Sequence, residues 1–405
     1  MVLVAHWCTP LELGIYALAW TVVGFLRTAQ ERTLAAPYMV LAHRRREKGD
    51  SLLGSSLVHQ ALFAVAAGLG LLLLAVSVFA WNPIWDVSAM PTSILALAFA
   101  VPMMLLRDHL RAVSYTHFRY HIALVMNTLV GIIQLGGLLF AAAAGWLSIP
   151  LLYVWIGVAH LLPCAIWILL RPQPFRVIPS ELGTDWRESW AYSRWLVVAR
   201  TLGIASHTLI PWFIAVQFGK IAAGQFGTCL APVGLTMMFM TGVNNFLQPQ
   251  SVRAYQVDGL TGLKKSLGQS TAVFLTSLGP VTILLFVLGD RLLDWIYKID
   301  FPHAGLVVFL LSLNLLLVSM TVVAGNGMAA LKRSTGFIWG EATYCIASLG
   351  SAIVLISKWG MIGAALALVI GGVVGVLVMT VTLWRFLAES VHNSTDALSL
   401  TGEGL

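Results

Sequence analysis

Charged and polar side chains interrupt the first long apolar stretch of the chain, residues 13–40. Arg27, Glu31 and Arg32 lie near its middle, beside Gln30. An ionisable group inside a membrane span is costly unless it faces a polar cavity or a partner. Arginine in such a cavity suits phosphate, because its planar fork binds phosphate oxygens through two hydrogen bonds and stays charged when partly desolvated. These residues are therefore candidate ligands for an anionic group.

A structural role is the alternative for the same residues. Glu31 follows Arg27 by one helical turn and can pair with it on one helix face. Arg32 has no such partner on its own helix and can extend its guanidinium to lipid headgroups. The sequence favours the cavity for Arg27 and Glu31. For Arg200, an arginine of a later span, the cavity and the membrane surface are equal alternatives.

Two amides and one isolated acid extend the candidate site. Asn244 and Asn245 can bind the hydroxyl groups of a polar substrate or join neighbouring helices, and the sequence does not separate these roles. Glu341 stands alone in a later span, where a carboxyl can carry a coupling proton, although a contact between helices is the commoner use. We therefore include both asparagines among the candidate substrate-binding residues and Glu341 as a candidate for ion coupling.

The composition is that of an integral membrane protein. Hydrophobic residues make up 59% of the chain and charged residues only 10%, so long apolar stretches recur along it. Hydropathy predicts about eleven transmembrane helices of about 17–25 residues each. The net charge of +7 lies mainly in short loops such as Arg44-Arg45-Arg46, which indicates membrane topology rather than nucleic-acid binding. We predict an all-α integral membrane fold.

The basic residues also predict orientation and domains. Alternating the spans places most of the 24 Lys and Arg residues, Arg107 and Arg111 among them, on one side, which we assign to the cytoplasm. The C-terminus lies on the same side. The expected parts are an N-terminal lobe with a truncated first helix, a cytoplasmic linker, a C-terminal lobe of six helices and a polar cytoplasmic tail, in residues 1–170, 171–189, 190–390 and 391–405.

The two halves of the chain repeat one pattern. Leu13-Gly14-Ile15-Tyr16 and Ala223-Gly224-Gln225-Phe226 each open a long span that ends near a proline and basic residues. Alignment of Pro37 with Pro249 places Arg32 opposite Asn244 and predicts two parallel repeats. A full span precedes Gly224, whereas too few residues for a span precede Gly14. We expect a parent of about twelve helices, with most of the first one missing or excluded by the choice of start site.

These features carry a family resemblance. The Gly-x-aromatic opening at Gly14, the Pro before the basic loop, and Leu106-Arg107-Asp108-His109-Leu110-Arg111 resemble the polysaccharide flippases. That family belongs to the superfamily that also holds the MATE multidrug exporters and the lipid II flippases. The resemblance implies two lobes that form a V-shaped cleft, open to each side in turn. It also implies export of undecaprenyl-pyrophosphate-linked oligosaccharide across the bacterial inner membrane, for lipopolysaccharide or exopolysaccharide biosynthesis. Membrane lipids and polysaccharide assembly proteins are the implied partners.

In such a flippase, Arg27, Arg32 and Arg200 are expected to hold the pyrophosphate. The hydrated cleft is expected to hold the sugars, whose hydroxyls Asn244 and Asn245 can bind. A drug or metabolite antiporter of the same fold is the first alternative, with a smaller cavity and fewer cationic groups. A membrane polysaccharide polymerase or ligase is the second. The longest outer loops, residues 81–91 and 289–303, lack a recognisable nucleophile, base and orienting acid. We therefore predict a transporter rather than an enzyme, with no cofactor and no metal.

Overall fold

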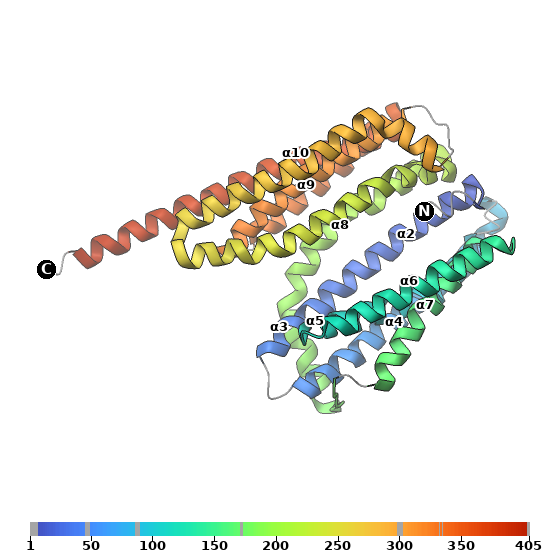
Figure 1. Ribbon diagram of the computed structural model, residues 1–405, viewed down its shortest axis with the longest axis horizontal. Coiled ribbons are helices and arrows are strands. Elements are labelled where there is room, and N and C mark those ends of the chain that lie inside the picture. Colours follow the sequence, from blue (N-terminus) through green and yellow to red (C-terminus); the bar gives the residue numbers. More distant parts are fainter. Residues whose placement is uncertain are drawn as a thin grey trace. The chain divides into compact units, whose positions relative to one another are not determined.

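The computed structural model describes residues 7–44, 49–85, 90–170, 173–297, 303–331, 333 and 335–402. These residues form helices and no strand (Figure 1). The elements are α2 (Pro10–Gln30), the π-helix η1 (Glu31–Ala35), α3 (Ala36–Arg44), α4 (Gly49–Trp85), α5 (Met90–Thr116), α6 (Tyr120–Ala143), α7 (Ile149–Leu170), α8 (Pro179–Tyr297), α9 (Ala304–Ala330) and α10 (Thr335–Gly402).

The helices confirm the predicted all-α membrane architecture. Within the described ranges, eight helices are long and apolar enough to cross a bilayer. Two of them are broken by glycines with positive φ, Gly219 and Gly259 in α8 and Gly360 in α10. Glycine adopts this left-handed backbone without a steric penalty, so the chain can leave the helix there. The number of membrane crossings stays a prediction.

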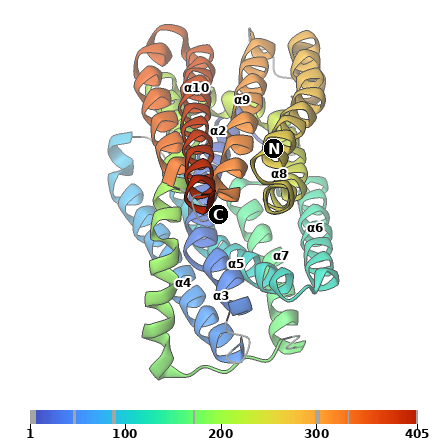
Figure 2. The same cartoon turned by 90° about the vertical axis from the view of Figure 1, so that its left-hand side faces the viewer.

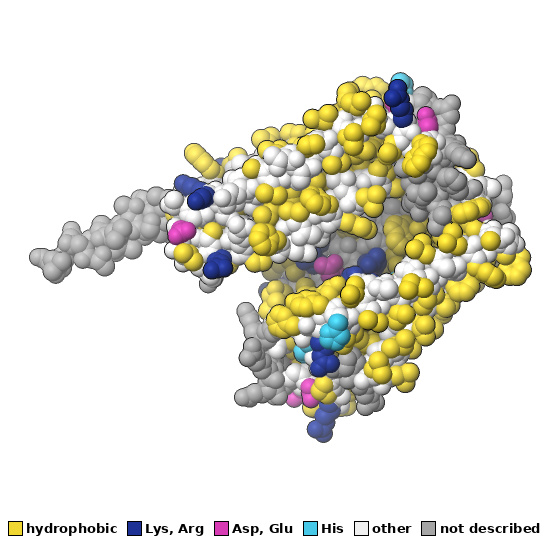
Figure 3. Space-filling view, viewed as in Figure 1, with side chains coloured by type: hydrophobic (Ala, Val, Ile, Leu, Met, Phe, Trp, Pro, Cys, Tyr) yellow, Lys and Arg dark blue, Asp and Glu magenta, His cyan; other side chains and the backbone are white. Residues whose placement is uncertain are grey.

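Apolar side chains cover much of the helix surface. Leu73, Leu169 and Val216 are among many large hydrophobic side chains that are exposed. Figure 3 shows such side chains spread along the helices on one face, with few charged groups among them. Lipid tails are the solvent that suits this surface, because the hydrocarbon core of a bilayer offers no hydrogen-bond partners. The chain is a multi-pass membrane protein.

Helix α2 begins at a well-defined cap. The backbone N–H of Glu12 donates to Thr9 Oγ1 at 3.3 Å, and the backbone N–H of Thr9 donates to Glu12 Oε2 at 2.8 Å. This reciprocal pair is a capping box, and Pro10 in the first helical position favours the same start. Residues 1–6 lie outside the described part of the chain, so the truncated first helix stays a prediction.

The chain divides into two compact units. We call residues 3–201 the N-terminal unit and residues 202–405 the C-terminal unit. Helix α8 begins at Pro179, so the linker expected at 171–189 is helical from that residue onward, because proline favours the first turn and no later residue of the segment breaks it. Helix α10 likewise continues through Gly402, into the expected tail. The lobe boundaries remain a prediction.

Helix α5 is the central helix of the N-terminal unit. It packs against α4 and α7, and it also contacts α2 and α6 (Figure 2). Ala100, Val101, Leu105 and Val113 of α5 are fully buried. Close packing on several sides fixes the rotation of a helix, since a turned helix would lose these contacts. Polar side chains on α5 are therefore held in defined positions.

Candidate functional site

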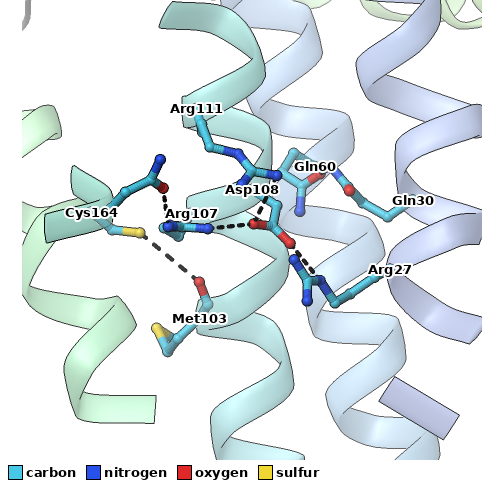
Figure 4. Close-up of polar contacts among 9 residues, drawn as sticks. Arg27, Gln30, Gln60, Met103, Arg107, Asp108, Arg111 and Cys164 are labelled. Atoms are coloured by element: carbon cyan, nitrogen blue, oxygen red, sulfur yellow. Dashed lines mark hydrogen bonds and ion pairs between the residues drawn. The ribbon is translucent and has the colours of Figure 1, made fainter. Parts of the chain in front are cut away.

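Three arginines surround the carboxylate of Asp108 in the N-terminal unit (Figure 4). Arg27 Nε lies 2.6 Å from Asp108 Oδ2, and Arg107 Nη1 lies 2.8 Å from Oδ1. Arg111 Nη2 is 3.6 Å from the same Oδ1. We call these four residues the arginine cluster. Three positive charges and one negative charge leave the cluster with a net charge of two positive units.

Two helices supply the arginine cluster. Arg107, Asp108 and Arg111 come from α5, where residues one turn apart lie on the same face. Arg27 comes from the last turn of α2, which contacts α5. The short side chain of Asp108 therefore reaches one arginine on another helix and two on its own. This arrangement satisfies the rule that a buried charge must be paired.

The three arginines are held to different degrees. Arg107 is only 8% exposed and donates to Asp108 Oδ1 and to Asn127 Oδ1 on α6. Arg27 and Arg111 are 36% and 33% exposed. Within the described residues, Arg27 donates through Nε alone, and the 3.6 Å contact of Arg111 is too long for a hydrogen bond. Arg27 and Arg111 thus keep free N–H donors, whereas Arg107 is fixed.

Buried hydrogen bonds join the helices that carry the cluster. Gln30 Nε2 donates to Gln60 Oε1 at 2.8 Å and links α2 to α4. Ser56 Oγ and His109 Nε2 are 2.8 Å apart and link α4 to α5. Gln60 and His109 are fully buried. A buried polar group without a hydrogen-bond partner destabilises the folded protein. These bonds therefore favour one relative position of α2, α4 and α5.

A π-helical turn follows α2 directly and begins four residues after Arg27. The element η1 holds Glu31 and Arg32, and the backbone N–H of Ala36 donates to the carbonyl of Glu31. Such wide turns occur mostly as single turns and frequently at functional sites. Arg32 Nη2 lies 3.2 Å from Glu31 Oε1, with the two side chains 28% and 58% exposed. The π-turn therefore presents an ion pair that remains accessible.

This geometry corrects two expectations. Glu31 pairs with Arg32, so the predicted pair of Arg27 and Glu31 is wrong. The expectation that Arg32 lacks a partner on its own helix is also wrong. Asp108 is the partner of Arg27 because it is 10% exposed and needs compensation, whereas the more exposed Glu31 is solvated more easily. Substrate binding by Arg27, Glu31 and Arg32 stays a prediction.

Arg107 and Arg111 lie within helix α5 rather than in a loop that follows it. Hydropathy alone predicts a transmembrane span over residues 94–106, but α5 continues to Thr116. Polar residues lower the mean hydropathy, yet arginine and leucine are good helix formers, so the helix does not stop. Arg107 and Asp108 are functional candidates that the sequence analysis did not select. The one indication in the sequence was a charged pair directly after an apolar run.

The remaining candidates are not members of the arginine cluster. Arg200 lies half-buried in α8 and is not among the ion-pair partners of Asp108. Asn244 accepts a hydrogen bond of 2.8 Å from Asn326 Nδ2 on α9, and Asn245 is exposed. Asn244 thus joins two helices, as one of its two predicted roles requires. Binding of sugar by either asparagine stays a prediction.

A second group of polar side chains lies in the C-terminal unit. Tyr344 Oη is 3.0 Å from His207 Nε2 and accepts a 3.4 Å hydrogen bond from Asn314 Nδ2. We call these three residues the neutral polar chain. Glu341 precedes Tyr344 by one turn of α10 and packs against Gly203, where a Cβ atom would lie 2.0 Å from Glu341 Oε2. Ion coupling by Glu341 stays a prediction.

Solved transporter structures share this fold. An inward-facing MATE family multidrug resistance transporter of the MOP superfamily aligns with a TM-score of 0.80 and 11% identity, over 96% of this chain and 93% of that one. The lipid II flippase MurJ in an inward closed conformation aligns with a TM-score of 0.72 and 16% identity, over 98% and 88%. A MOP superfamily transporter from Pyrococcus furiosus aligns with a TM-score of 0.71 and 9% identity, over 95% and 90%.

No protein-family model matches the chain, and no curated protein matches it. Sequence identities of 9–16% support a statement about fold and not about substrate. The chain has the fold shared by MATE transporters and the flippase MurJ.

Proposed function

We propose that the chain is a membrane flippase that moves oligosaccharide linked to undecaprenyl pyrophosphate across the bacterial inner membrane by alternating access, for polysaccharide biosynthesis. The observation that carries this proposal is the arginine cluster, whose net charge is positive inside a helical bundle. Two of its members, Arg27 and Arg111, keep N–H donors that make no hydrogen bond within the described residues. Paired phosphates are the chemical groups that these donors fit best.

The physical task explains the need for such a cluster. The hydrocarbon core is about 30 Å thick, and an ionised diphosphate cannot enter it unaccompanied. Arginine side chains can replace part of the water around the phosphates while remaining charged. The lipid tail needs no such help and can stay in the bilayer. A positive site on α2 and α5 therefore lowers the barrier for the headgroup.

The fold and the charge together favour a lipid-linked anion over a cationic drug. One structure of this fold is described as a lipid II flippase, which supports a lipid substrate. Another is described as a multidrug resistance transporter, so an antiporter for drugs or metabolites is the alternative. A net charge of two positive units would repel a cationic drug. The cluster thus favours the flippase.

Export of a diphosphate can draw on the membrane potential alone. Two negative charges moving outward across about 100 mV gain roughly 4.6 kcal/mol, at about 2.3 kcal/mol per charge. A proton carried by Glu341 would add to this drive without being required. In this proposal the arginine cluster holds the diphosphate, Arg32 and Arg200 supply further positive charge, and Asn244 and Asn245 bind sugar hydroxyls.

Deletion of the gene tests the proposal in cells. Lipid-linked oligosaccharide should accumulate on the inner leaflet, and the restored gene should relieve the accumulation. A gene carrying Arg27→Gln and Arg111→Gln should fail to do so at equal protein level. Arg333→Gln is the control, because the same type of substitution there removes one positive charge from an exposed pair with Glu389. Absence of accumulation, with altered sensitivity to toxic small molecules, would identify an exporter instead.

A further inference from the structure

We infer that Asp108 is a positioning residue that sets the charge of the site to match a diphosphate with two ester links. In this inference Arg107 and Asp108 form a permanent neutral pair, and Arg27 and Arg111 form the receptor. The bound diphosphate takes the place of Asp108 on Arg27. This inference rests on the proposed function and adds a role for the one acid of the cluster, together with a physical reason why a diphosphate link is favoured.

The contacts of Asp108 divide naturally into one strong pair and two exchangeable ones. Arg107 is buried, and both terminal nitrogens of its guanidinium donate hydrogen bonds, Nη1 to Asp108 Oδ1 and Nη2 to Asn127 Oδ1. Arg27 touches Asp108 through Nε only, at Oδ2, and is about a third exposed. Arg111 makes an ion pair without a hydrogen bond. Release of Arg27 and Arg111 would therefore leave Asp108 compensated by Arg107.

Carboxylate and phosphate oxygens are interchangeable acceptors for arginine. The fork of Arg27 binds a phosphate through two parallel N–H groups, and one such arrangement uses Nε, which now donates to Asp108. A phosphate that takes this position gains a donor that the protein already orients. Asp108 thus acts as a stand-in that keeps Arg27 paired while no substrate is bound. An unpaired arginine at this depth would be costly.

The charge count selects the substrate class. With Arg107 and Asp108 neutral as a pair, two positive charges remain on Arg27 and Arg111. A diphosphate esterified at both ends, to a lipid and to a sugar, has one ionised oxygen on each phosphorus and carries two negative charges. A monophosphate diester carries one negative charge and would leave one arginine uncompensated. The cluster therefore favours a diphosphate link over a monophosphate link.

A transporter must also release its substrate. Without the charge of Asp108, three arginines would face the diphosphate, and the complex would be tighter than transport requires. Asp108 remains beside the site and can return to Arg27 as the diphosphate leaves. Only interactions that change along the path speed transport, in the same way that uniform binding does not speed catalysis. Asp108 is thus expected to weaken binding and to raise turnover.

Binding and transport measured together test this inference. The probes are N-acetylglucosamine linked to farnesol through a diphosphate and, for comparison, through a monophosphate. For Asp108→Asn in the full-length protein we expect the Kd of the diphosphate probe to fall about tenfold, from the added net charge. Transport turnover in proteoliposomes should fall as well. A purely structural role predicts weaker binding together with slower transport.

A double variant restores the charge count and guards against misfolding. Arg107→Gln with Asp108→Asn removes one charge of each sign, so two positive charges remain, and its Kd should return to within about threefold of the unmodified protein. Glu389→Gln, in an exposed pair of the other unit, should change neither quantity. Weaker binding by Asp108→Asn, or unchanged binding, overturns the inference. If the unmodified protein binds neither probe, the proposed function fails and the inference fails with it.

Discussion

The N-terminal unit and the C-terminal unit hold different polar groups among their packed helices. In the N-terminal unit three arginines surround the buried carboxylate of Asp108. In the C-terminal unit buried Asn314 donates a hydrogen bond to Tyr344, and the Tyr344 hydroxyl makes a second hydrogen bond with His207. Amide, phenol and imidazole groups can hold helices together without a net charge. The two units thus share a helical framework but are suited to different tasks.

This difference indicates where the substrate is recognised. Helix contacts between neutral polar groups in membranes contribute about 0.6 kcal/mol on average, so they can break and form again during a conformational change. A charged cluster binds more strongly and is more selective for its ligand. We therefore expect the arginine cluster to determine which substrate is carried. The neutral polar chain is expected to influence packing.

The largest effect should follow from loss of both exchangeable arginines. Each hydrogen bond to a charged group contributes about 1.5–3 kcal/mol, so Arg27→Gln with Arg111→Gln should slow transport of a diphosphate-linked lipid about a hundredfold or more. Tyr344→Phe, which removes the centre of the neutral polar chain, should slow it less than about fivefold. Initial rates in proteoliposomes measure both. Equal losses in the two variants would remove the distinction between the units.

Loss of the central acid should have the next largest effect, on stability. Asp108→Ala leaves Arg107 buried beside Asn127 without a counter-charge, and breaking a buried ion pair in this way costs about 3–5 kcal/mol. The thermal midpoint of the detergent-solubilised protein should therefore fall clearly. Glu389→Ala is the control, because its pair with Arg333 is exposed and contributes about 0–1 kcal/mol. A midpoint equally insensitive to both changes would mean that the cluster is hydrated and contributes little to folding.

A smaller effect is expected in the C-terminal unit at Gly203. A Cβ atom there would lie 2.0 Å from Glu341 Oε2, the end of a flexible side chain, so Gly203→Ala must displace that carboxylate and should destabilise the unit by about 1 kcal/mol or less. At Gly242 a Cβ atom meets nothing within 4 Å. Gly242→Ala should therefore be neutral or stabilising by up to about 1 kcal/mol, because alanine favours helix. Thermal unfolding distinguishes the two. Identical midpoints would show that Glu341 has room to move.

The smallest effect is expected at Glu341 itself. Glu341→Gln removes an ionisable group and keeps its shape, so transport at neutral pH should change less than about twofold if the membrane potential drives export. If Glu341 carries a coupling proton, the same change should flatten the pH dependence of the rate. Rates between about pH 6 and pH 8 measure this. A collapse of transport at every pH would instead give Glu341 a place in substrate binding.

Much of the fold followed from the sequence, because long apolar segments have few alternatives to membrane helices. The basic loops predicted an orientation that no contact in the structure tests. The end of α5 was misplaced, since hydropathy falls at Arg107 although the helix does not end there. The π-turn at Glu31 was also missed. Its wider hydrogen-bond ring has no pattern of residue types that would indicate it from one sequence.

The candidate site was predicted only in part. Arg27 was selected because a charge among apolar residues is conspicuous in a sequence. Its partner Asp108 was not, since the pairing depends on how α2 packs against α5, far away in the chain. Arg107 and Arg111 lay too close to the end of a predicted span to be separated from a basic loop. Isolated charges can thus be found from sequence, whereas their partners require the tertiary structure.

The central claim is that Arg27 and Arg111 bind the diphosphate of a lipid-linked sugar. The most direct test is an electron cryo-microscopy map of the protein in lipid nanodiscs with the diphosphate-linked farnesyl probe. The claim predicts density for two phosphates within hydrogen-bond distance of both arginines, with Asp108 still paired to Arg107. Density for the headgroup elsewhere, with Arg27 still bound to Asp108, would contradict it.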